Sequence, residues 1–416
     1  MHKLMCILTV VLLSVLAFHV KAQSVSGDSL TINAAVNTAI ENNPELQVLL
    51  KKIEASKAIK IQSGLMPNPE FGLEAENILG NNDFEGFRGS EITATVSQNI
   101  LLAGKINKLE KIADKEISLA EWNYEAKRLE IIIDVRKAFN NALAIKRLSQ
   151  KNSELIKISN EFIVNLKRRV KAGKISPAEV SRSQIILNLL EININKLKSD
   201  YDEAIFKLKT LLNDSDQSFE TLKGKLKEIE TLPDYDSLLY KLKNNPNLKR
   251  FESEYDKQKA VITFEESKQI PDLTISAGYK RLNEVNANTF LVGLSLPLPI
   301  FNRNQGSIQE AKIRLDQKSI EYNVVKNKLT FQLNLYYSKL KMLLTSANRL
   351  KNESIPIAKE AFKIINEGNL VGRFTILDVL DAQRTLFEIQ NQYLTILSNI
   401  NTTVIEIEGL TVSNME

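Results

Sequence analysis

Cysteine and histidine are almost absent from the sequence. The 416 residues include one cysteine, Cys6, and two histidines, His2 and His19. All three lie near the N-terminus, in a segment that we expect to be removed. The remaining chain would have no disulfide and no Cys/His metal site. It would also lack the residues for Ser-His-Asp or Cys-His catalysis.

Glycine and proline are also scarce, with 15 and 10 residues. This argues against a turn-rich all-β domain and favours long helices. Hydrophobic residues make up 43% and charged residues 25%, enough to bury a sizeable core. The formal charge is only +5, with lysine and glutamate interleaved along the chain. We therefore expect no nucleic-acid partner, because such a protein concentrates basic charge on one face.

The one long hydrophobic run lies at the N-terminus. Lys3 precedes an apolar stretch at Ile7–Phe18, which is too short to span a bilayer. The segment at 1–22 is therefore predicted to be a signal peptide cleaved after Ala22, with an N-terminal anchor as the alternative. Cys6 lies before the apolar stretch, where a lipidated cysteine is not expected. The rest of the chain has no apolar run of about 18 residues, so it could enter a membrane only as a closed β-barrel.

Four landmarks recur in the same order about 200 residues apart, which predicts two copies of one unit. They are the Asn-Asn-Pro segments at 42–46 and 244–248, Pro69 and Pro271, Gly173 and Gly372, and Gln184 and Gln383. We expect this division of the chain: signal peptide 1–22, first repeat 23–213, linker 214–233, second repeat 234–411 and tail 412–416.

Each unit has the same predicted order of elements. Helices are expected at about 31–64 and 234–268, strands at 69–79, 90–101, 272–281 and 289–298, long helices at 104–170 and 304–367, and return helices at 176–212 and 375–408. The strands alternate apolar with small or polar residues over a length that suits a tilted membrane-spanning strand. Soluble hairpins packed on the helices are the alternative.

Helices of this length cannot share one compact core. About 65 residues make a helix of nearly 100 Å. The return helix carries apolar and glutamine side chains at alternating spacings of four and three, a heptad seam that predicts coiled-coil packing. The seam consists of Val379, Gln383, Leu386, Gln390, Tyr393, Leu397, Ile400 and Val404. Four strands cannot close a barrel with a lumen, so membrane insertion would require an oligomer. Three protomers would supply twelve strands.

Several motifs resemble those of the outer-membrane efflux channel family typified by TolC, and within it the CzcC-like branch that serves heavy-metal (cobalt-zinc-cadmium) efflux. The strongest is the segment 372–387, GRFTILDVLDAQRTLF. Supporting segments are 65–70, 98–104 and 406–411. The resemblance covers essentially the whole chain after the predicted signal peptide.

The resemblance implies a mainly α fold with a small β part. It further implies a homotrimer with a twelve-stranded transmembrane β-barrel in outer-membrane lipid, a helical tunnel across the periplasm and an equatorial layer that includes the linker. Such a channel is a passive conduit that works with a periplasmic adaptor (membrane fusion protein) and an inner-membrane RND-type pump. We expect divalent heavy-metal cations as cargo, no cofactor and no enzyme activity; the sequence has no P-loop.

Two alternatives stay open at this point. The same channel could carry drugs or secreted proteins. A protein of another class, an exported coiled-coil structural or adhesion protein, would share the heptads but has no reason to repeat the paired strands.

Two sites are implied by the motif match. Asp378 and Asp381 match the acidic pair at the periplasmic entrance, where three-fold symmetry would form carboxylate rings that favour cations. Ion pairs with Arg373 or Arg384 are the alternative for these residues. The adaptor-docking tips are expected at Gly173, Lys174, Ile175 and Ser176, and at Gly372, Arg373, Phe374 and Thr375. Basic residues near the first tip could meet acidic adaptor residues. No metal site is expected, because Met66, Met342 and Met415 are far apart.

Overall fold

The computed structural model describes residues 29–213, 219 and 221–413. The predicted signal peptide and its cleavage site lie outside these residues. The chain forms two compact units, and each is assembled from segments of both repeats. Among the described residues, the first contains 29–42, 134–213, 219, 221–228 and 349–401; the second contains 43–133, 229–348 and 402–413.

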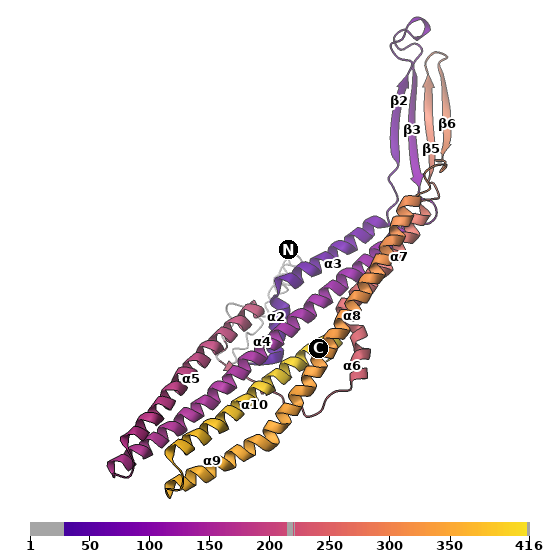
Figure 1. The fold of residues 1–416 in the computed structure, drawn as a ribbon. Helices are drawn as coiled ribbons and strands as arrows, with labels where there is room; N and C mark the ends of the chain where they lie inside the picture. Colours follow the sequence, from indigo (N-terminus) through magenta and orange to yellow (C-terminus); the bar gives the residue numbers. More distant parts are fainter. Residues whose placement is uncertain (1–28, 214–218, 220, 414–416) are drawn as a thin grey trace, which may run out of the picture. The chain divides into compact units, whose positions relative to one another are not determined.

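The first unit is almost entirely helical (Figure 1). It holds α2 (Ile32–Asn42), the second half of α4 (Lys105–Lys171), α5 (Pro177–Leu212), a π-helical turn (Leu350–Ser354), α9 (Ile355–Leu370) and most of α10 (Ile376–Thr411). Its two short strands, β1 (Ser29–Leu30) and β4 (Thr221–Leu222), pair in parallel. The strand pair therefore connects the start of the described chain to the linker between the repeats.

From Val379 to Ile400, the heptad seam of α10 faces the interior of the first unit. Val379, Gln383, Leu386, Leu397 and Ile400 are buried, and Gln390 and Tyr393 are half-buried. The linker is held against the same helix, since the Asn401 side chain accepts from the Lys227 backbone N–H at 3.0 Å and donates to the Lys227 carbonyl at 2.9 Å. The amide side chain of Asn401 thus satisfies both the N–H and the carbonyl of Lys227.

The second unit contains the remaining helices and one sheet. The helices are α3 (Pro44–Ser63), α6 (Tyr235–Lys241), a 3₁₀ turn (Leu242–Asn244), α7 (Pro246–Ser267), α8 (Gln305–Arg349), the first half of α4 and the end of α10. Leu46 and Leu248 are almost fully buried in this unit, as are Leu333 and Leu340.

The helical segments expected at about 31–64 and 234–268 each consist of more than one helix. Each is interrupted just before a proline, at Asn43 and Asn245. Both asparagines cap the helix that follows: Asn43 accepts from the Leu46 N–H at 3.1 Å and Asn245 from the Asn247 N–H at 2.9 Å. The reason is physical, because the residue before a proline avoids the helical region and proline favours the first helical turn.

The predicted helix at 304–367 is likewise not a single α-helix. The π-helical turn at Leu350–Ser354 separates α8 from α9. Pro356 follows two residues later and has no N–H to donate to the carbonyl of Asn352, so the regular ladder cannot continue through this point.

The sheet of the second unit has four antiparallel strands in the order β2-β3-β5-β6. They are β2 (Glu70–Glu76), β3 (Glu91–Ile100), β5 (Leu273–Leu282) and β6 (Ala287–Ser295), seen together in Figure 1. The central pair joins the two repeats, because β3 pairs with β5 from Glu91↔Leu282 to Ile100↔Leu273. β2 and β6 are therefore the two edges.

The register separates the side chains into an apolar face and a polar face. Nine large hydrophobic residues of one face are exposed: Phe71, Leu73, Ile92, Val96, Ile275, Tyr279, Phe290, Val292 and Leu294. The opposite face carries mainly glycine, serine, threonine and glutamate. Over the described residues, no helix combines the length and the apolar character needed to cross a membrane.

Candidate functional site at the helical tips

The first tip is the turn between α4 and α5. Gly173 has a φ of +66°, a left-handed conformation that glycine adopts without strain. The N–H of Lys174 donates to the Arg169 carbonyl at 2.9 Å, and that of Gly173 to the Val170 carbonyl at 2.9 Å, closing the end of α4. Ser176 then caps α5 by accepting from the Ala178 N–H at 3.2 Å. The turn is therefore fixed on both sides.

The second tip, between α9 and α10, repeats this construction. Gly372 has a φ of +77°, and the N–H of Arg373 donates to the Gly368 carbonyl at 2.8 Å. The Phe374 ring lies over Gly368, where an added Cβ would be 2.5 Å from the ring carbon Cδ2. This close approach positions the ring at the turn.

Polar and apolar contacts join the two tips. Arg169 donates from Nη1 to Asn369 Oδ1 at 2.9 Å, and Asn369 Nδ2 donates to the Phe374 carbonyl at 2.8 Å. Asn369 is only 4% exposed. Behind these bonds lies a buried cluster of Leu166, Ile376 and Leu380, with Phe162, Ile175, Val180 and Ile186 packed against it. The tips predicted separately from sequence thus form one packed structure.

Asp378 is part of a helix cap in the protomer. Its Oδ2 accepts from the Thr375 N–H at 2.8 Å and from the Thr375 hydroxyl at 2.7 Å, while the Asp378 N–H donates to Thr375 Oγ1 at 3.1 Å. This reciprocal pair is a capping box. The hydroxyl and backbone hydrogen bonds from Thr375 stabilise the carboxylate and lower the pKa of Asp378 below its usual value. The sequence itself carries a signal for this cap, because a threonine followed three residues later by an acidic residue is typical of a capping box.

Asp381 lies one turn further along α10 and pairs with a neighbour on the same helix. Its Oδ1 is 2.7 Å from Arg384 Nη2, and both side chains are more than 60% exposed. Arg384 also lies 3.8 Å from Glu388. The ion pair with Arg384, one of the two interpretations that the sequence left open, is formed in the protomer. An exposed pair of this kind is weak, so the carboxylate remains accessible.

Basic side chains gather at the first tip. Lys167, Arg168, Lys171 and Lys174 are all exposed, and none has an ion-pair partner within residues 29–213, 219 and 221–413. Arg169 differs from them because its guanidinium is held by Asn369. The first tip therefore presents a surface of four unneutralised positive charges.

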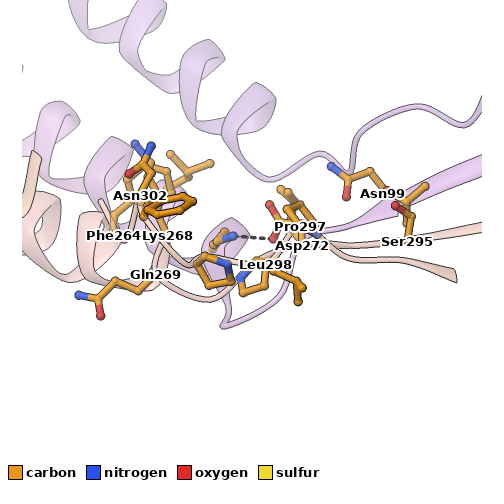
Figure 2. Close-up of a pocket in the computed structure, with 16 residues that line it drawn as sticks. Asn99, Phe264, Lys268, Gln269, Asp272, Ser295, Pro297, Leu298 and Asn302 are labelled. Carbon is orange, nitrogen blue, oxygen red and sulfur yellow. Dashed lines mark hydrogen bonds and ion pairs between the residues drawn. The ribbon is translucent and has the colours of Figure 1, made fainter. Parts of the chain in front are cut away.

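A second cluster lies in the other unit, where the sheet meets its helices, and was not found from sequence. A cleft of about 950 Å³ is lined by Phe264, Lys268, Pro297 and Leu298, among others. Figure 2 shows these four side chains. Lys105 and Asp272 also line the cleft. Lys105 Nζ donates to Asp272 Oδ1 at 2.6 Å and to the Ile270 carbonyl at 2.7 Å. The Leu102 N–H also donates to Asp272 Oδ1, at 2.9 Å. The Lys105 side chain is 8% exposed, so this pair ties the start of α4 to the start of β5.

No group of three or more histidine, cysteine, aspartate or glutamate side chains in the described chain is arranged to hold a metal ion. The acidic side chains of the tip are engaged with a helix cap and with an arginine. The geometry therefore offers charged surfaces and a packed helical end.

Comparisons with known proteins agree with this architecture. The outer membrane efflux protein family model matches residues 35–214 and 240–411. The cobalt-zinc-cadmium resistance protein CzcC of Cupriavidus metallidurans is 30% identical over 88% of this chain and 86% of its own. The nickel-cobalt-cadmium resistance protein NccC of Alcaligenes xylosoxydans is 21% identical over 70% of this chain and 67% of its own.

A solved structure supports the fold independently. The crystal structure of CusC superposes with a TM-score of 0.72 at 16% sequence identity, covering 91% of each chain. The family model matches twice, once in each half of the chain, as expected for two repeats. The chain therefore belongs to the outer membrane efflux protein family, and it is an outer-membrane efflux channel of the TolC type that extends into the periplasm.

Proposed function

We propose that three copies of this chain form the exit conduit of a tripartite efflux system that expels divalent heavy-metal cations. The conduit is passive and not an enzyme, and it works with a periplasmic adaptor and an RND-type pump in the inner membrane. The observation that carries the proposal is the 30% identity to a cobalt-zinc-cadmium resistance protein over nearly the full length of both chains.

The sheet supports assembly into a trimer. Its edge strands β2 and β6 have no strand partner on their outer side within the described residues. Unpaired backbone groups are very costly in lipid, so these edges need neighbours. Three four-stranded sheets joined edge to edge give the twelve-stranded barrel. The apolar face then contacts lipid and the polar face lines the lumen.

The tips support the position of the entrance and of the adaptor. In the trimer, Asp378 and Asp381 form the acidic rings at the periplasmic entrance, and the turns at 173–176 and 372–375 meet the adaptor. The four exposed basic residues of the first tip favour adaptor segments that carry acidic side chains. Metal selection falls to the pump, because thiols and imidazoles are absent after the predicted signal peptide and the methionines are far apart.

A deletion strain tests the cargo. The strain is grown with zinc, cobalt, cadmium or copper and, in parallel, with dyes and detergents. Selective metal sensitivity that the intact gene rescues is the expected result. Sensitivity to dyes and detergents alone contradicts the metal cargo and favours the alternative, a channel of the same type for drugs. The mass of the detergent-purified protein tests the trimer.

The charge at the entrance can be tested with a matched pair of variants. Asp378→Asn/Asp381→Asn removes both charges, while the asparagine at 378 can still accept the hydrogen bond from the Thr375 N–H. Glu388→Gln removes an exposed carboxylate of the same helix that lies outside the proposed rings and the docking turns. We expect reduced metal resistance from the first variant and near-normal resistance from the second. The reverse order contradicts a role for the acidic rings.

A further inference from the structure

The polar face of the sheet carries an uneven distribution of charge. Glu70, Glu74 and Glu76 of β2 and Glu91 of β3 lie on this face, together with Lys280 of β5. Four carboxylates and one ammonium give a net formal charge of −3 in each protomer. The remaining positions of this face are neutral, so the excess charge is not cancelled elsewhere on it.

Lys280 neutralises only one end of the face. Glu76 and Glu91 lie directly opposite each other in the register, and Lys280 forms ion pairs with both, 3.2 Å from Glu76 Oε2. Glu74 lies in the same row as Lys280, separated from it by Thr93 of β3, and Glu70 lies further along β2, opposite Ser97. Within the described part of the chain, neither of these two carboxylates has an ion-pair partner, and both side chains are exposed.

Most residues around these two carboxylates have small side chains. Glycine occupies three positions of the same face, Gly72, Gly278 and Gly293. A Cβ at Gly72 would lie 2.9 Å from Thr95 Oγ1, and one at Gly293 would lie 2.5 Å from Ser276 Oγ. Serine and threonine fill the space between the glycines. The one large apolar side chain in the row of Gly72 and Gly278 is Leu291, which lies on β6, the edge strand farthest from β2. Glu70 and Glu74 of β2 are exposed.

We propose that Glu70 and Glu74 determine the charge selectivity of the outer-membrane part of the conduit, favouring cations over anions as they leave. This inference rests on the proposed trimer, in which the polar face lines the lumen and six unpaired carboxylates surround it. The carboxylates act through their field on hydrated cations and not as metal ligands. The selectivity is thus located at the strands, separate from the acidic residues of the helical tips.

The test is the reversal potential of the full-length channel in planar bilayers across a potassium chloride gradient. Concentrations stay at or below 0.1 M, where the Debye length is about 10 Å or more. Four proteins are compared: wild type, Glu70→Gln/Glu74→Gln, Lys280→Gln and Thr289→Gln. Thr289 lies on the same face, opposite Lys280 in the register. Its variant therefore introduces the same glutamine side chain as the other variants but leaves the charge of the face unchanged. Each is also made in an Asp378→Asn/Asp381→Asn background, so that the entrance does not mask the effect.

Opposite shifts are expected from the two charge variants. Glu70→Gln/Glu74→Gln lowers the cation-to-anion permeability ratio about twofold or more, and Lys280→Gln raises it because Glu76 and Glu91 lose their counter-charge. Thr289→Gln leaves the ratio unchanged. Channels whose ratio is the same in all four proteins, in both backgrounds, overturn the inference while the conduit stands. Wild-type trimers that form no channel overturn the conduit itself and this inference with it.

Discussion

Arg169 and Asn369 are 200 residues apart in the sequence and are joined by a hydrogen bond of 2.9 Å between Nη1 and Oδ1. Asn369 uses its other polar atom to hold the Phe374 carbonyl. One buried amide therefore links the hairpin of the first repeat to the turn of the second. The bond also withdraws Arg169 from the basic surface that its neighbours form at the first tip.

Asn369→Ala should loosen both tips together. The substitution leaves the Arg169 guanidinium and the Phe374 carbonyl without their partner, at a cost of about 1–3 kcal/mol. Hydrogen exchange of the segments 168–175 and 368–376 measures the loss. Asn366→Ala, which changes the same residue type one turn earlier on α9, is the matched control. Faster exchange at only one tip would contradict the link.

Gly368→Ala should have opposite effects in two backgrounds. In wild type the new methyl group meets the Phe374 ring at 2.5 Å. In Phe374→Ala that obstacle is gone, and alanine favours the helix over glycine by up to about 1 kcal/mol. We expect a coupling free energy of about 1–2 kcal/mol from the double-mutant cycle, read from chemical unfolding in detergent. If the effects of the two substitutions on the free energy of unfolding are simply additive, the Phe374 ring moves away from the new methyl group without cost.

The cap of α10 should weaken at low pH. The folded-state pKa of Asp378 is depressed by its hydrogen bonds to Thr375. A depressed pKa means that the folded state binds the proton less well, so the stabilisation is complete above about pH 4 and is lost as the pH falls through the folded pKa. Exchange of the Thr375 amide, followed as the pH is lowered, should reveal this loss.

Two variants test whether Asp378 is the group responsible. Asp378→Asn should remove the acid dependence of Thr375 protection. Asp381→Asn removes a carboxylate of the same helix but none of the capping hydrogen bonds, and it should leave the dependence in place. An equal effect of both variants would point to the overall charge of the tip.

Lys105→Met should destabilise the junction between helix and sheet. It leaves the Asp272 carboxylate without its cation, at a cost of up to about 3 kcal/mol, since Asp272 is itself partly exposed. Arg314→Gln is the matched control, because its pair with Glu310 is more than 60% exposed on both sides and should contribute under about 1 kcal/mol. The urea midpoint of unfolding in detergent measures the loss of stability in both variants. Equal shifts of the midpoint would contradict the expectation that the buried pair stabilises the fold more than the exposed pair.

The helices and strands have local signals in the sequence. Pro44 and Pro246 directly follow two of the helix interruptions, and Pro356 follows the π-helical turn at Leu350–Ser354. The cap by Thr375 and Asp378 also has a local signal, three residues apart. By contrast, the partners Arg169–Asn369 and Lys105–Asp272 are more than 160 residues apart, and no periodic pattern links them.

The sequence by itself determined the duplication, the long amphipathic helices, the alternation that separates the two faces of the strands, and the motifs of the efflux family. These features depend on spacings of two to four residues, which fix the direction of a side chain within its own helix or strand. Only the tertiary structure decided that β3 pairs with β5, that Lys280 lies between Glu76 and Glu91, and that Glu70 and Glu74 are left unpaired. Those outcomes depend on the register between strands, where a shift of one residue would bring every side chain to the other face.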